Sequence, residues 1–117
     1  MSNNLDEQRI RAALRQAWSP CTARQWTPAN RALGQCNVTA LVICARFGGE
    51  ILKTHLPEGT HFYNRISGQR YDFTDGQFAK PIHYDDIPSG KEEAREGATE
   101  AEEAALTIAF DRYYSKS

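Results

Sequence analysis

Residues 38–47, VTALVICARF, constrain the fold more than any other stretch of this sequence. Their apolar side chains point in nearly every direction around a helix, and a helix that is apolar all round must be buried. The run is too short to cross a bilayer, which needs about 20 apolar residues. Gly48-Gly49 supplies a left-handed cap at its end. We therefore predict a buried central helix that begins at about Cys36.

Two further helices are expected outside this central one. Residues 4–18 carry a single apolar stripe and end at Ser19-Pro20, with Asn4 as a possible cap. Near the other end of the chain, Thr99 and Glu102 have the spacing of a capping box. This pair predicts a C-terminal helix over residues 98–114.

Three short segments between these helices have the composition of strands: Glu50–Thr54, His61–Ile66 and Arg70–Thr74. The element order predicts an α+β protein, in which a small antiparallel three-stranded sheet packs on the buried central helix with two outer helices. We expect one domain over residues 1–117, with its core in residues 18–78. Residues 79–97 are predicted to be a loop.

Composition excludes several classes of function. With 14 basic and 15 acidic residues the formal net charge is −1, and no basic patch with interleaved aromatic residues suggests binding to nucleic acid. The N-terminus lacks the pattern of a signal peptide, and the cysteines (Cys21, Cys36 and Cys44) are odd in number. We expect a cytoplasmic protein with reduced thiols, without a membrane span, metal site or cofactor. The sequence leaves the oligomeric state open.

Cys36 stands at the start of the predicted central helix. The unpaired N–H groups and the dipole of a helix N-terminus stabilise a thiolate there, which makes a cysteine nucleophilic. A nucleophilic cysteine in turn requires a histidine as base and a third group to orient that histidine. The alternative is that Cys36 is only a small, partly buried residue.

The predicted hairpin around Ser67-Gly68 supplies a candidate pair. With a two-residue turn, His61 and Asp72 lie on the same face as diagonal neighbours, about 7–8 Å apart at the backbone. Asp72 would then accept a proton from one imidazole nitrogen and leave the other for Cys36. A three-residue turn would place Asp72 on the opposite face. Equally, the polar face of the hairpin is typical of a half-solvated sheet, with His61 and Asp72 as surface residues.

Four segments, GQCNVTALV, FGGEIL, HFYNRISG and YDFTDGQF, resemble the YunG family of uncharacterised bacterial proteins. The resemblance covers residues 18–78, about half of the chain. The same order of residues resembles a minimal papain-like or transglutaminase-like core. That resemblance implies that Cys36 is the nucleophile, His61 the base and Asp72 the orienting acid.

The resemblance also implies an oxyanion hole, and here this sequence departs from the papain pattern. Papain-type enzymes place a glutamine several residues before the cysteine, whereas Gln35 is its immediate neighbour here. The side chains of Asn30 or Trp26 are alternative donors, alongside the Cys36 backbone N–H. Asn64 is a candidate for orienting the substrate or His61.

We hypothesise a cysteine-dependent acyl-transfer enzyme, an amide or peptide hydrolase or an acyltransferase, acting on a small-molecule, peptide or protein substrate. The main alternative is a non-catalytic binding or interaction module on the same fold. A third possibility is a thiol-based redox sensor in which Cys21 resolves an oxidised Cys36.

Overall fold

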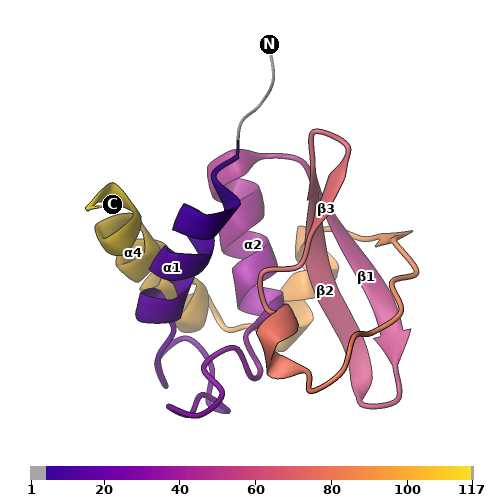
Figure 1. Ribbon diagram of the computed structural model, residues 1–117, viewed down its shortest axis with the longest axis horizontal. Coiled ribbons are helices and arrows are strands. Elements are labelled where there is room, and N and C mark those ends of the chain that lie inside the picture. The colour runs from indigo at the N-terminus through magenta and orange to yellow at the C-terminus, as the bar shows by residue number, and fades with distance from the viewer. Residues whose placement is uncertain (1–4, 117) are drawn as a thin grey trace.

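Helix α2, Cys36–Phe47, lies at the centre of the computed structural model, which describes residues 5–116. The sheet packs on one side of it, and helices α1, Glu7–Ala17, and α4, Glu100–Ser115, lie on the other (Figure 1). Every residue from Val38 to Ile43 is buried. The central helix is therefore buried, as its apolar circumference predicts.

The sheet is antiparallel and has four strands, β1 Glu50–Leu56, β2 Gly59–Ile66, β3 Gln69–Tyr71 and β4 Ile87–Pro88. Their order is β3-β2-β1-β4. The prediction of three strands is wrong, because the sheet has a fourth strand. This strand, β4, is only two residues long and pairs with β1 opposite Leu52 and Lys53. A strand this short shows no alternation of apolar and polar residues that would identify it in a sequence.

Residues 79–97 contain more than the predicted loop. Besides β4, they include a short helix α3, Lys91–Ala94, and a 3₁₀ turn η2, Arg95–Gly97. Another 3₁₀ turn, η1, Asp75–Gln77, follows the hairpin. Ala94 is fully buried against residues of α2 and the sheet, so this segment contributes to the core.

The hairpin between β2 and β3 has the predicted register, with Ile66 opposite Gln69. Ser67 and Gly68 both have positive φ, 52° and 80°, as the two central residues of a tight hairpin turn require. β3 ends at Tyr71, whereas the prediction extended it to Thr74. The Asp72 carboxylate accepts hydrogen bonds from the backbone N–H and hydroxyl of Thr74, which turns the chain away from the ladder.

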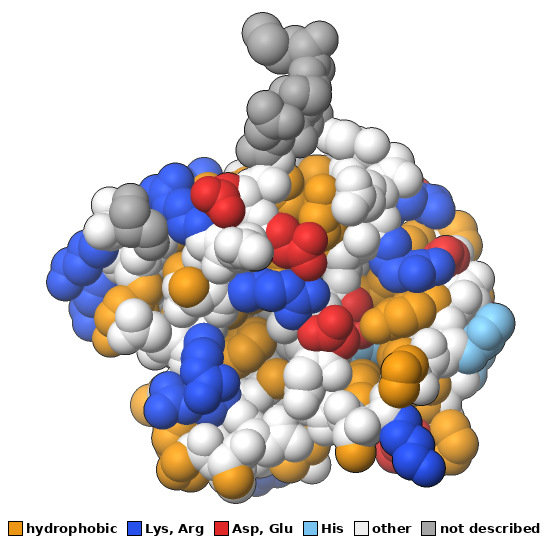
Figure 2. Space-filling view, viewed as in Figure 1, with side chains coloured by type: hydrophobic (Ala, Val, Ile, Leu, Met, Phe, Trp, Pro, Cys, Tyr) orange, Lys and Arg blue, Asp and Glu red, His pale blue; other side chains and the backbone are white. Residues whose placement is uncertain are grey.

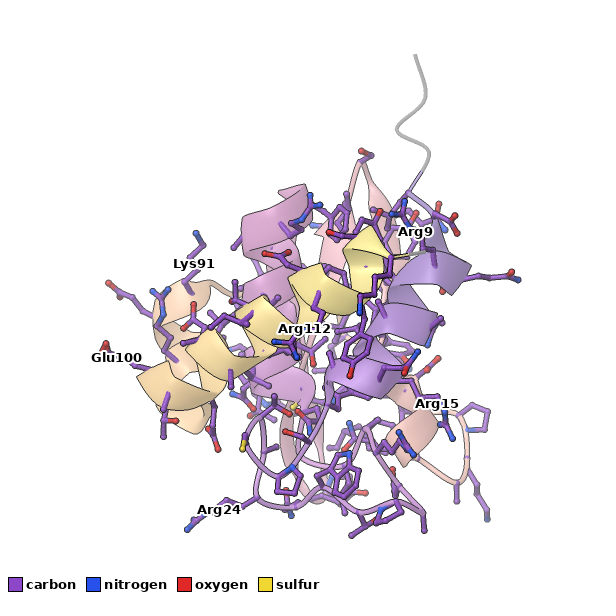
Figure 3. All side chains as sticks on the ribbon, turned by 90° about the vertical axis from the view of Figure 1, so that its left-hand side faces the viewer. Arg9, Arg15, Arg24, Lys91, Glu100 and Arg112 are labelled. Atoms are coloured by element: carbon purple, nitrogen blue, oxygen red, sulfur yellow. The ribbon has the colours of Figure 1, made fainter. Side chains whose placement is uncertain are left out.

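The outer helices begin at side-chain caps. Asp6 caps α1 by accepting a hydrogen bond from the Arg9 backbone N–H, whereas the predicted cap, Asn4, lies outside the described residues. The capping box of α4 is confirmed, because Thr99 and Glu102 make both reciprocal bonds. Figure 3 shows α4 lying across α1, with Arg9 beside its C-terminal turn. The Arg9 guanidinium stacks over the Tyr114 ring and donates a hydrogen bond to the backbone carbonyl oxygen of Tyr114.

The surface carries charges of both signs. Figure 2 shows Lys and Arg side chains interspersed with Asp and Glu on one face. None of the helices within residues 5–116 is long and apolar enough to span a membrane.

Candidate functional site

The candidate nucleophile occupies the first turn of α2. Gly34, just before the helix, has a φ of +76°, and a Cβ there would lie 2.5 Å from the Gln25 side-chain oxygen. This position therefore suits only glycine. The thiol of Cys36 is half-buried and donates to the Asn37 side-chain oxygen at 3.3 Å. Asn37 is itself held by a bond from its amide nitrogen to the Ala94 carbonyl.

His61 and Asp72 form a hydrogen-bonded pair inside the protein. The distance from His61 Nε2 to Asp72 Oδ2 is 2.7 Å, and the two residues are 3% and 6% exposed. This burial excludes the interpretation of the pair as neighbouring surface residues. It also shows that the polar face of the hairpin is covered at this end.

The Asp72 carboxylate accepts four hydrogen bonds. Oδ1 accepts from the backbone N–H and hydroxyl of Thr74, each at 3.2 Å. Oδ2 accepts from His61 and from the hydroxyl of Tyr84, each at 2.7 Å. A buried carboxylate is tolerated only when its oxygens are paired in this way, so Asp72 is fixed in position.

The His61 ring is held by aromatic neighbours and by its charge partners. Phe78 meets it edge-on with centroids 4.9 Å apart, and Tyr63 stacks on it at 5.9 Å. Burial lowers the pKa of His61, but hydrogen bonding to Asp72 and to Cys36 outweighs burial and raises this pKa to about 9. Since Nε2 is bound to Asp72, Nδ1 is the nitrogen left for the thiol.

Cys36 and His61 face one cavity of about 470 Å³. Amide side chains from Gln25, Asn37 and Gln77 line it, together with the Phe78 ring. A larger surface hollow of about 670 Å³ lies on α4, but no cysteine or histidine of the described residues lines it. The thiol and the imidazole thus share a space large enough for a small acyl group or for part of a peptide chain.

The other predicted site residues lie less directly at the cavity. Gln35 is fully buried beside Cys36, where its side-chain oxygen contacts the Thr22 hydroxyl. Asn30 donates its amide to the Gln77 carbonyl. The Trp26 ring packs against the core. Neither Gln35 Nε2 nor Trp26 Nε1 has a hydrogen-bond partner in the described part of the chain.

Asn64 has a structural role instead of a place at the cavity. Its side-chain amide donates to the Ala40 carbonyl at 3.0 Å and so links β2 to the middle of α2. Cys44 is half-buried, and Cys21 is exposed. Within residues 5–116, no three His, Cys, Asp or Glu side chains are grouped to hold a metal ion.

Sequence reasoning missed two aromatic residues of this site. Phe78 packs on the catalytic candidate His61, and Tyr84 binds Asp72. Both lie beyond the last predicted strand, where no periodic pattern relates them to the hairpin. An aromatic residue in a polar loop was the available signal, and it does not specify a partner.

The raised pKa of His61 gives stability a defined pH dependence. The pKa is higher in the folded protein than its ordinary value of 6.5, so the stabilisation is complete below about pH 6.5 and is lost as pH rises through about 9. Relative to His61→Gln, the wild-type free energy of unfolding should decrease by about 3 kcal/mol across this range. Denaturant titrations at several pH values measure it. A pH-independent difference would contradict an imidazolium at this position.

Two comparisons with known proteins, one with family models and one with individual proteins, identify the same family. A family model described as YunG protein matches residues 6–114. An uncharacterized protein YunG from Bacillus subtilis (strain 168) is 46% identical over 104 residues, covering 89% of this chain and 90% of the relative. No solved structure matches the chain significantly.

Proposed function

The chain belongs to the YunG family, and we propose that it is a cysteine-dependent acyl-transfer enzyme. Cys36 is the nucleophile, His61 the general acid and base, and Asp72 the group that orients His61. One observation carries the proposal: the buried Asp72 occupies Nε2 of His61, and His61 lines the same cavity as the Cys36 thiol. An imidazole fixed between a carboxylate and a thiol is the arrangement that activates a cysteine.

The placement of the three groups supports a papain-like or transglutaminase-like interpretation. A cysteine begins a buried helix, a histidine follows on β2, and an aspartate follows β3. The start of α2 lies beside the start of β2, because Cys36 and His61 line one cavity.

The proposed reaction has two steps. The Cys36 thiolate attacks a carbonyl carbon and forms a C–S bond. The C–N or C–O bond to the leaving group breaks as His61 transfers its proton to that group, which leaves the acyl group on Cys36 as a thioester. Neutral His61 then takes a proton from water or an amine, which attacks the thioester and releases Cys36. Attack by water is hydrolysis, and attack by an amine is acyl transfer.

Donors to the oxyanion are available at the start of α2. The Cys36 backbone N–H belongs to the first turn, whose N–H groups have no partner within a helix. The neighbouring Gln35 also has an unpaired Nε2, but this atom is buried and Gln35 does not line the cavity. We propose the Cys36 backbone N–H as a donor of the oxyanion hole, since such donors stabilise the charge that develops during attack.

Alkylation with iodoacetamide tests the proposal without a substrate. In the wild type, Cys36 should be labelled rapidly at about pH 6.5, where a thiol with an ordinary pKa of about 8.5 is mostly protonated. Because His61 is the cation that pairs with the thiolate, His61→Ala should slow this labelling about tenfold or more. Mass spectrometry of each cysteine peptide across a pH series measures the rates.

The exposed Cys21 is an internal control, because it lies outside the cavity and its labelling rate should be the same in both proteins. If Cys36 is labelled no faster than Cys21, or only on unfolding, the thiol is not activated. The chain would then be better explained as a binding module.

A further inference from the structure

We infer that Tyr84 is a positioning residue that limits how strongly Asp72 holds the proton of His61. The inference rests on the proposed function, because it concerns the proton that His61 must give to a leaving group. Its basis is a shared atom. The Tyr84 hydroxyl and His61 Nε2 both contact Oδ2 of Asp72, each at 2.7 Å.

Two donors on one oxygen compete. Their hydrogens carry partial positive charge and point at the same atom, so each weakens the electrostatic attraction available to the other. The Tyr84 dipole disfavours the imidazolium more than the neutral imidazole, because the imidazolium places more positive charge beside it. Tyr84 therefore makes His61 a better acid than a simple aspartate–histidine pair would.

Tyr84 reaches Asp72 from a segment that we call the strap, residues 83–86. The chain after β3 crosses the sheet before it enters β4 (Figure 1). Asp85 binds the Thr54 hydroxyl of β1, and Asp86 binds Arg70 of β3 through two bonds of 2.8 Å. The strap is thus anchored to the sheet independently of the bond from Tyr84 to Asp72.

The charged and titratable groups around the pair come from several elements. Cys36 of α2 and Tyr63 of β2 adjoin the His61 ring. Arg70 of β3 lies 4.4 Å from the centre of the Tyr84 ring. Arg11 of α1 donates to the Asp72 carbonyl and pairs with Asp75 of η1, which also acts on Tyr84.

None of these groups replaces the hydroxyl of Tyr84 on Oδ2. Burial and the bond to Asp72 raise the pKa of Tyr84 well above its ordinary value of 10. The hydroxyl consequently stays protonated and donates throughout the range in which His61 titrates. A phenylalanine would keep the ring contacts and remove only this donor.

The test is the titration of His61 in Tyr84→Phe, followed by NMR of the histidine ring signals. His61 is assigned by the signal that disappears in His61→Gln. We expect the His61 pKa to rise by roughly half a unit to one unit, a threefold to tenfold change in proton affinity. An unchanged or lower pKa would overturn the inference.

Tyr63→Phe is the matched control. The Tyr63 hydroxyl bonds to Asp86 and so anchors the strap without touching Asp72. If Tyr63→Phe raises the pKa of His61 as much as Tyr84→Phe does, the rise comes from loosening of the strap and not from the lost bond to Asp72. The inference then fails. A wild-type Cys36 that is labelled independently of His61 would instead defeat the proposed function, and the titration would still decide the role of Tyr84.

Discussion

Replacement of Cys36 by serine is expected to reduce hydrolysis of p-nitrophenyl acetate about a thousandfold or more. A serine hydroxyl is not ionised near neutral pH, so the variant lacks the thiolate that we propose as the nucleophile. Serine is close to cysteine in volume, and Cys36 is half-buried at a helix start, so the fold should be retained. Release of p-nitrophenolate gives the rate, and circular dichroism checks the structure.

The controls for this variant are Cys21→Ser and Cys44→Ser. Neither side chain lines the cavity that Cys36 shares with His61, so both variants should keep the wild-type rate. Mass spectrometry of the acetylated wild type should place the acetyl group on the Cys36 peptide. Full activity in Cys36→Ser would show that another residue is the nucleophile and would contradict the assignment of Cys36.

Replacement of Asp72 by asparagine is expected to lower the same activity by about 10²- to 10⁴-fold. An asparagine has one acceptor oxygen, whereas both oxygens of Asp72 accept hydrogen bonds from donors. Either His61 and Tyr84 or Thr74 must then face an NH₂ group. The variant also loses the negative charge that stabilises the imidazolium.

The Asp72→Asn variant should remain alkylatable at alkaline pH, because its thiol is still present. We expect its free energy of unfolding to fall by about 1–3 kcal/mol, the usual cost of an unsatisfied buried polar group. Asp75→Asn is the comparison, since Asp75 lies in the same turn and is exposed, where it pairs with Arg11. Equal activity of the two variants would remove Asp72 from the proposed triad.

The sequence predicted the local arrangement of the hairpin well. Turn residues and strand alternation are short-range properties, so Ser67-Gly68 indicated a register that the structure confirms through the pairing of Ile66 with Gln69. That register places Asp72 within reach of His61. β4 was missed because two residues carry no periodicity, and the strap was missed because its contacts join distant parts of the chain.

The candidate site likewise has some features that the sequence predicted and others that depend on contacts between distant segments. The roles proposed for Cys36, His61 and Asp72 were predicted from their residue types and spacing, and the buried central helix was predicted from its apolar circumference. Whether the His61–Asp72 pair is buried or solvated depended on what covers the polar face of the hairpin. Phe78 and the strap supply that cover.

The sequence by itself therefore determined a buried helix with a cysteine at its start and a hairpin that aligns a histidine with an aspartate. Only the tertiary structure decided that these groups meet at one cavity, that Asp72 is buried, and that Tyr84 shares its oxygen with His61. The physical reason is the range of the interactions. Periodicity and turn geometry act between neighbours in the chain, whereas burial and the sharing of hydrogen bonds depend on packing between distant segments.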